Sequence, residues 1–231
     1  MTSRSRLIAP AACLALCSCA QGGPSPAADA AAATPAQSGG VAVPPPATRT
    51  IDRTDWRGTA TAADRARIRD WYTAWQDALT DARAHGHAAD VAAEGALLDP
   101  AAGATGRPLP PPGDYRCRVI KLGARSAQML SYVAYPAFLC RVATDGDRLA
   151  FAKLGGSQRQ VGTIWADTEQ RGIFLGTLML GDEQQPFRYG TDDARNLAGL
   201  VERLGDNRWR IVFPRPAFES VTDVMELVPA G

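Results

Sequence analysis

The residues Asp-Tyr-Arg-Cys-Arg-Val-Ile-Lys-Leu at positions 114–122 and Ala-Phe-Leu-Cys-Arg-Val at positions 137–142 decide the fold that the sequence predicts. Apolar residues recur at every second position in both segments, which is typical of β-strands with one buried face. Cys117 and Cys140 lie on these apolar faces. In an oxidising compartment we therefore expect a disulfide between neighbouring strands. Two buried free thiols, which pack as small hydrophobic groups, are the alternative.

Short strands separated by turn residues continue to the C-terminus. They are expected at residues 115–122, 137–143, 148–153, 158–165, 172–178, 187–189, 197–204, 209–213 and 223–228. Such strands favour an antiparallel meander, and closure into a barrel removes its two exposed edges. The predicted fold is α+β and mainly β, with an N-terminal helical segment packed on an eight- to nine-stranded, calycin-like barrel. A β-sandwich is the alternative fold. An eight-stranded barrel is either filled by side chains or able to hold one small ligand.

Two helices are expected before the strands. Apolar residues at three- and four-residue spacings predict a helix over residues 61–84 and a shorter one over residues 88–98. The aromatic residues of the longer helix are expected to face the core, and a shelf for a sugar or lipid is the alternative. These residues are Trp71, Tyr72 and Trp75.

The first 18 residues resemble a signal peptide. Arg4 and Arg6 precede an uncharged apolar run that is too short to span a bilayer. The run ends in Leu16-Cys17-Ser18-Cys19, which resembles the lipobox of bacterial lipoproteins. This resemblance implies lipid attachment to Cys19. Ala20 after the cysteine, in place of Asp, resembles lipoproteins sent to the outer membrane, so we expect a periplasmic protein anchored there. Ordinary cleavage after Ala20, which would give a free periplasmic or secreted protein, is the alternative.

The composition then divides the chain into four parts. After Cys19 the sequence is rich in Ala, Pro, Gly and Ser and lacks apolar periodicity, so we expect a disordered linker. The predicted parts are a signal peptide (1–18), a lipid anchor with this linker (19–50), a helical segment with a connector (51–113) and the barrel (114–231).

Charge and motifs exclude several classes of function. The formal net charge is +1, which gives no electrostatic reason to expect nucleic acid as a partner. The chain has no glycine-rich phosphate loop and no Cys-x-x-Cys pair, so no cofactor is expected. The two histidines, His85 and His87, flank a glycine without a third ligand cluster. We therefore expect a solvated helix end there rather than a metal site.

Two sets of residues are candidates for a site. Basic and aromatic side chains near the early strands would suit the rim of one barrel mouth, where they would meet a ligand with a polar end or a partner protein. Scattered surface positions are the alternative. The set consists of Lys121, Arg125, Tyr132, Tyr135, Lys153 and Trp165. Glu219 and Glu226 would suit general acids if they were buried, whereas an ion pair with an arginine is the ordinary role.

Five motifs also carry a family resemblance. They are Gly-Asp-Tyr-Arg-Cys-Arg (113–118), Tyr-Pro-Ala-Phe-Leu-Cys-Arg-Val (135–142), Phe-Leu-Gly-Thr-Leu (174–178), Arg-Trp-Arg-Ile-Val-Phe-Pro (208–214) and Glu-Leu-Val-Pro (226–229). With the preceding Trp-Gln-Asp-Ala-Leu helix, they look like an uncharacterised bacterial family, the domain of unknown function numbered four-eight-nine-three. The resemblance covers about Trp56 to the C-terminus. It implies an envelope protein without an assigned activity, so no catalytic positions follow from it.

These observations together predict a lipid-anchored periplasmic protein that binds without turnover. The membrane would be its partner through the lipid, and its ligand would be a small molecule, a cell-wall fragment or an envelope protein. A structural or assembly lipoprotein of the envelope is one alternative. A carboxylate-dependent envelope hydrolase is the other.

Overall fold

A computed structural model describes residues 55–103 and 106–231. The signal peptide, the lipidation of Cys19 and the linker, all predicted for residues 1–50, lie outside the described residues. Within those described ranges, no helix combines the length and the apolar character needed to cross a bilayer.

The helices precede the strands, as predicted. They are α1 (Trp56–Thr59), α2 (Ala62–Arg69), α3 (Trp71–Ala82) and α4 (Ala88–Ala93), with a kinked turn at Arg83–His87 and a short 3₁₀ turn at Gly95–Leu97. The helix predicted over residues 61–84 is therefore broken, because Asp70 has non-helical backbone angles between α2 and α3. The Thr61 side chain caps α2 by accepting a hydrogen bond from the Asp64 backbone N–H.

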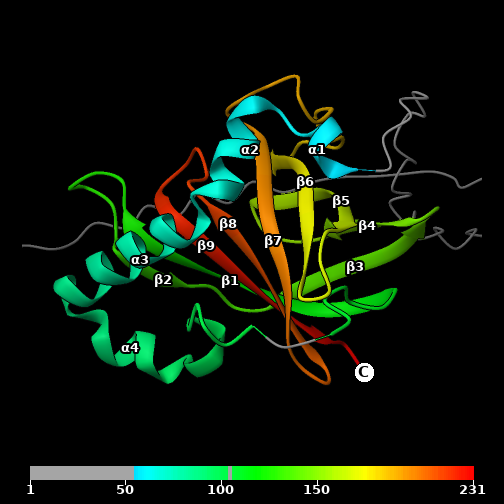
Figure 1. Cartoon of the computed structure of the whole chain (residues 1–231). Coiled ribbons are helices and arrows are strands. Elements are labelled where there is room, and N and C mark those ends of the chain that lie inside the picture. Colours follow the sequence, from blue (N-terminus) through cyan, green and yellow to red (C-terminus); the bar gives the residue numbers. More distant parts are fainter. Residues whose placement is uncertain (1–54, 104–105) are drawn as a thin grey trace, which may run out of the picture. The chain divides into compact units, whose positions relative to one another are not determined.

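Nine strands build the rest of the described chain (Figure 1). They are β1 (Gly113–Ala124), β2 (Tyr132–Ala134), β3 (Phe138–Asp145), β4 (Arg148–Lys153), β5 (Gln158–Ala166), β6 (Arg171–Leu180), β7 (Asn196–Gly205), β8 (Arg208–Pro214) and β9 (Ser220–Pro229). Neighbours pair antiparallel in the order β2-β1-β3-β4-β5-β6-β7-β8-β9, and β1 also pairs with β9. The β1–β9 pairing closes eight strands into a barrel, and β2 is an additional strand beside β1. The mainly β barrel is therefore confirmed, and the sandwich alternative is wrong.

Two segments differ from the predicted strands. Residues 187–189 lie in a loop, where Phe187 is exposed and the Tyr189 hydroxyl donates to Asp64 Oδ2 at 2.5 Å. A side-chain contact with α2 therefore positions this segment, and its backbone does not form part of the sheet. Conversely, β2 was not predicted, because three residues are too few for an alternation to be recognised.

The predicted disulfide joins β1 to β3. Tyr115 pairs with Cys140 and Cys117 pairs with Phe138 in the ladder, so the two cysteines are diagonal neighbours on one face. A disulfide connects them with their Cα atoms 5.9 Å apart, and both residues are completely buried. The sequence prediction of this pair is confirmed.

Side chains fill most of the barrel interior. Edge-to-face contacts link Phe174 to both Phe151 and Phe213, with ring centroids 5.9 and 5.4 Å apart. Gly162 pairs with Gly176 beside them, and a Cβ on Gly162 would lie only 2.4 Å from a backbone oxygen of Leu175. The interior around these aromatic rings therefore leaves no room for a ligand.

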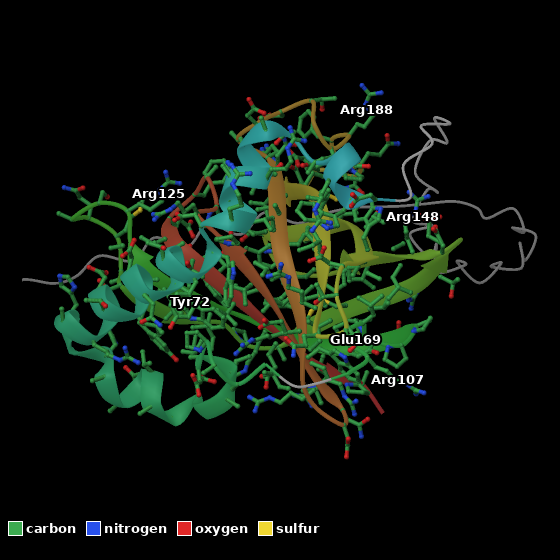
Figure 2. The ribbon with its side chains drawn as sticks, viewed as in Figure 1. Tyr72, Arg107, Arg125, Arg148, Glu169 and Arg188 are labelled. Atoms are coloured by element: carbon green, nitrogen blue, oxygen red, sulfur yellow. A yellow bond between two sulfur atoms is a disulfide. The ribbon has the colours of Figure 1, made fainter. Side chains whose placement is uncertain are left out.

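The helices cover the outer face of the barrel. α3 runs beside β1 and β9 in Figure 1, and its Trp75 and Leu79 are buried against outward-facing residues of these strands. Burial of such side chains contributes roughly 1.5–3 kcal/mol each. Trp75 thus faces the core as predicted, whereas Tyr72 is half exposed on α3 (Figure 2).

A buried arginine fastens the helical segment to β8. The Arg210 guanidinium forms an ion pair with Glu202 at 2.7 Å and lies 4.5 Å from the ring centroid of Trp75. It also donates to the backbone carbonyls of Ala96 and Asp99 at 2.8 and 2.7 Å. These contacts satisfy both a buried charge and carbonyls at the end of the helical segment.

Candidate functional site

Polar side chains gather inside one end of the barrel. Along β1, Cys117, Val119 and Lys121 share the interior face, because successive side chains of a strand alternate between its two faces. In the same way Lys153 follows the interior Phe151 by two positions along β4. The C-terminal ends of β1 and β4 lie at the same end of the barrel, since the strands are antiparallel in the order given by the sheet. The chain thus brings both lysines to one opening.

A cavity of about 110 Å³ lies at this end. Its buried floor includes Lys121, Lys153 and Gln160, and its apolar wall includes Val119 and Phe138. The exposed rim is formed by Tyr135, Gly156, Ser157 and Glu219. A cavity of roughly 150 Å³ accommodates benzene, so this space suits a ligand group of about five non-hydrogen atoms.

Two carboxylates compensate the positive charge of Lys121. Its Nζ lies 3.1 Å from Glu219 Oε2 and 3.4 Å from Asp223 Oδ2. Burial disfavours the ammonium, but the two carboxylates outweigh burial and raise the pKa of Lys121. Burial also raises the pKa of Asp223, which accepts a hydrogen bond from the Ser220 hydroxyl. Lys121 is therefore held as a cation.

Lys153 has a different environment. Its Nζ donates to the backbone carbonyls of Gly155 at 2.6 Å and Gln158 at 2.9 Å, and it lies 4.1 Å from the centroid of the Phe138 ring. Among the described residues, no carboxylate forms an ion pair with it. Burial, together with the positive charges of Arg159 and Lys121, lowers the pKa of Lys153 to about 8. Within one cavity, the pKa of Lys121 is therefore raised and the pKa of Lys153 is lowered.

One amide in the cavity floor is unsatisfied. Gln160 is buried, and its Oε1 has no hydrogen-bond partner among the described residues. An unsatisfied buried polar group costs about 1–3 kcal/mol, which a donor on a bound molecule would recover. The neighbouring Gln158 is engaged, because its Nε2 donates to Glu219 Oε1 at 3.3 Å.

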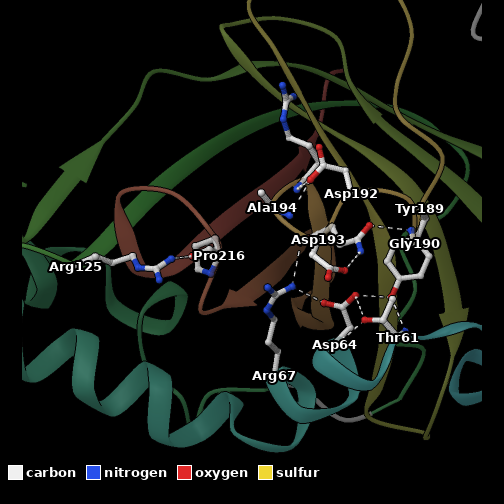
Figure 3. Close-up of polar contacts among 12 residues, drawn as sticks. Thr61, Asp64, Arg67, Arg125, Tyr189, Gly190, Asp192, Asp193, Ala194 and Pro216 are labelled. Carbon is white, nitrogen blue, oxygen red and sulfur yellow. Dashed lines mark hydrogen bonds and ion pairs between the residues drawn. The ribbon is translucent and has the colours of Figure 1, made fainter.

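The loop before β9 positions Glu219 at the rim. Glu219 has a φ of 65°, in the left-handed region that non-glycine residues rarely occupy. Its backbone carbonyl accepts a hydrogen bond from the Arg125 N–H at 3.3 Å. The Arg125 guanidinium also donates to the Pro216 carbonyl (Figure 3). Two contacts from one residue therefore hold the strained backbone, which keeps the carboxylate beside Lys121.

Three of the six residues predicted for a barrel mouth line this cavity: Lys121, Tyr135 and Lys153. Arg125 lies beside the cavity, in contact with the loop that carries Glu219.

Tyr132 and Trp165 do not lie at this mouth. The Tyr132 hydroxyl donates to Glu94 Oε1 at 3.3 Å, and its ring stacks on His87. Trp165 is buried against the helical segment on the outer face of the barrel. It directly follows the interior Ile164, so the alternation of β5 turns it outward.

The remaining sequence candidates are engaged in ion pairs. Glu226 lies 2.5 Å from Arg118 Nε and 2.6 Å from Arg208 Nε. Although burial opposes ionisation, these arginines lower the pKa of Glu226, which does not suit a general acid. His85 and His87 contact Asp81 and Asp90, respectively. The part of the chain that the structure describes holds no cluster of three or more metal-ligating side chains.

A second buried polar cluster ties α2 to the loop before β7. Asp64 accepts hydrogen bonds from the Thr61 hydroxyl at 2.9 Å, from Arg67 Nη1 at 2.6 Å and from the Tyr189 hydroxyl (Figure 3). Because its carboxylate is fully hydrogen-bonded within the protein, we interpret this cluster as structural.

Sequence reasoning did not identify Gln160 and Asp223 as site residues, and it overlooked how rare lysine is in this chain. The chain has 25 lysine and arginine residues, but only two of them are lysines, Lys121 and Lys153. All other positive side chains of this kind are arginines, and both lysines line the cavity. Counting lysines separately from arginines would have drawn attention to this pair.

Comparison with known proteins identifies a family without a described activity. No curated protein and no solved structure gives a significant match to the chain. The family model described as "Domain of unknown function (DUF4893)" matches residues 56–227, which include the helical segment and nearly the whole barrel. The chain therefore belongs to the DUF4893 family.

Proposed function

We propose that the protein is a lipid-anchored periplasmic binding module whose barrel cavity takes a small anionic ligand without turning it over. The envelope location and the anchor at Cys19 rest on the sequence of the leader, which lies outside the described residues. The ligand site rests on the cavity between Lys121, Lys153 and Gln160.

The uncompensated charge of Lys153 carries this proposal. Lys121 has two carboxylate partners, whereas in the part of the chain that the structure describes the Lys153 ammonium contacts only backbone carbonyls and an aromatic face. A buried charge without a partner is costly, and Arg159 and Lys121 make the surroundings more positive. A carboxylate on a ligand would supply the missing negative charge, and a hydroxyl beside it would satisfy Gln160 Oε1.

Titration calorimetry with matched ligands tests this site. Glycolate and glycolamide have nearly the same shape, but only glycolate is charged. We expect glycolate to bind at least about tenfold more tightly, because one charge-assisted hydrogen bond contributes roughly 1.5–3 kcal/mol. The Lys153→Met variant should lose this preference, since methionine keeps the length of the side chain without the charge.

The control is Arg141→Met. Arg141 pairs with Asp114 on the exposed surface, where both side chains are about half exposed, and it is not part of the cavity wall. This variant should bind glycolate like the unmodified protein. Equal affinities for glycolate and glycolamide, or unchanged glycolate binding in Lys153→Met, would refute an anion site at Lys153.

Mass spectrometry of protein from its own membranes tests the anchor. We expect an acylated Cys19 as the first residue of the mature protein, and a Cys19→Ala variant should be recovered without detergent. A mature N-terminus that carries no lipid would rule out the anchor, while the ligand site would be unaffected.

A further inference from the structure

We propose that Lys153 is a nucleophilic amine that captures a small aldehyde or ketone in the cavity as an imine. This inference rests on the proposed ligand site and specifies its ligand, which would carry a reactive carbonyl next to its negative charge.

The use of lysine at this position is the first argument. Everywhere except in this cavity, the chain employs arginine where lysine would also provide a positive charge. The arginine guanidinium is always protonated in proteins, whereas burial without a carboxylate partner lowers the pKa of a lysine amine. A position that required only positive charge would not distinguish the two residues. Lys121 meets that need as a cation paired with two carboxylates, whereas at position 153 lysine, unlike arginine, also permits a neutral amine.

The hydrogen bonds of Nζ would orient the amine in its neutral form. A neutral amine has two N–H groups and one lone pair, and the carbonyls of Gly155 and Gln158 accept two hydrogen bonds from this nitrogen. With both hydrogens held by the backbone, the lone pair is left for an electrophile in the cavity. Both acceptors belong to the β4–β5 turn and the start of β5, so the nitrogen is held by backbone rather than by mobile side chains.

Burial and neighbouring cations are a further argument for a nucleophilic amine. A lysine is activated as a nucleophile by desolvation or by another cationic group nearby. Lys153 has both, because it is buried and both Lys121 and Arg159 disfavour its protonation. With a pKa of about 8, roughly one fifth of the Lys153 side chains are neutral at pH 7.4, against less than about 0.1% for an ordinary lysine.

The proposed reaction needs no oxidant or reductant. The Nζ lone pair attacks the carbonyl carbon, a C–N bond forms, and the carbonyl electrons move to oxygen, which takes up a proton. The nitrogen gives up one of its protons, which leaves a neutral carbinolamine. The hydroxyl group then takes up a proton and leaves as water, and the nitrogen lone pair forms the C=N bond of a protonated imine. Lys121, held as an ammonium by Glu219 and Asp223, is a proton donor in the same cavity. Amine, carbonyl and one proton are thus converted to a protonated imine and water.

Glyoxylate is the probe for this reaction. It has an aldehyde and a carboxylate on five non-hydrogen atoms, and therefore fits the size of the cavity. Cyanoborohydride would reduce its imine to a carboxymethylated lysine, which peptide mass spectrometry locates. The two lysines and the α-amine are the primary amines of the whole chain, so the assignment is unambiguous.

We expect the full-length protein to be labelled at Lys153 about tenfold faster than free Nα-acetyl-lysine at pH 7.4. The larger neutral fraction accelerates the reaction, while the lower intrinsic nucleophilicity of a less basic amine removes part of that gain. The rate should rise with pH around 8 and then level, because the amine is then fully neutral. Glycolate, which lacks the aldehyde, should slow the labelling.

The Lys153→Arg variant separates this inference from the proposed function. Arginine keeps the positive charge, so glycolate should still bind, whereas no imine can be trapped at position 153. Labelling of Lys121 at a similar rate, or a Lys153 rate that is still rising at pH 10, would overturn the imine proposal. The pH profile of the unmodified protein decides this even if Lys153→Arg does not fold. Selective labelling of Lys153 without protection by glycolate would retain the nucleophile and refute the anion site.

Discussion

Replacing Lys153 by methionine should remove a pH-dependent part of the stability. Burial and nearby positive charges lower the Lys153 pKa from 10.5 in a model peptide to about 8 in the folded protein. At pH values between these two, the unfolded chain keeps the proton and the folded protein releases it. The free energy of unfolding therefore rises with pH in this window, because stability increases wherever the unfolded state binds more protons.

The expected size of the effect follows from this shift. Since one pKa unit corresponds to 1.36 kcal/mol, Lys153 should contribute a rise of about 3 kcal/mol between pH 7.5 and 10.5. Lys153→Met has no such rise. At pH 7 the variant should be more stable by about 1 kcal/mol, because removal of the charge penalty outweighs the loss of two hydrogen bonds worth roughly 1 kcal/mol each.

Urea unfolding followed by tryptophan fluorescence at several pH values between 7 and 10 measures this effect. The useful quantity is the difference in the free energy of unfolding between Lys153→Met and the unmodified protein. Burial raises the pKa of Tyr115 and of Tyr132, but the contribution of tyrosine ionisation is the same in both proteins and cancels. Arg141→Met, on the exposed surface, should follow the unmodified protein at every pH. If the difference between Lys153→Met and the unmodified protein stays constant from pH 7 to 10, the Lys153 pKa is not lowered and the argument for a neutral amine fails.

Two further predictions concern the fold. Replacing Cys117 and Cys140 together by alanine should cost about 3 kcal/mol, as expected for a disulfide that spans 23 positions in the sequence; a cost below about 1 kcal/mol in chemical unfolding would contradict a structural role. Arg210→Met should cost about 3–5 kcal/mol, because it leaves Glu202 as an unpaired charge in a largely buried site. Arg203→Met, whose partner Asp206 is wholly exposed, should change stability by less than about 0.5 kcal/mol in the same assay, and equal losses in the two arginine variants would refute the distinction.

Local patterns were sufficient for much of the barrel. Alternation identified seven of the eight barrel strands over residues 115–213 and the last strand near residue 223, because each strand has one side in the core. Cys117 and Cys140 were paired correctly for the same reason, since both lie on the apolar side of consecutive strands. The break of the long helix at Asp70 was missed because α2 and α3 pack on different parts of the barrel, and no proline or glycine marks the change.

Prediction of the site needed both the sequence and the tertiary structure. Lys121 and Lys153 could be assigned to interior faces from the sequence, because each follows an interior residue by two positions. Trp165 shows the limit of such reasoning, since a shift of one residue moves a side chain to the opposite face of the sheet.

The sequence by itself determined the alternation of the strands and the rarity of lysine, with two lysines among 25 lysine and arginine residues, and the prediction of export rests on it alone. Only the tertiary structure decided that these lysines share one cavity, because the antiparallel order β1-β3-β4 brings them to one end and the pairing of β1 with β9 closes the barrel around them. Closure also decided that Lys121 has carboxylate partners, whereas no carboxylate of residues 55–103 or 106–231 pairs with Lys153. The physical reason is that charge compensation depends on distances of a few ångströms between residues about 100 positions apart, and no local pattern specifies such distances.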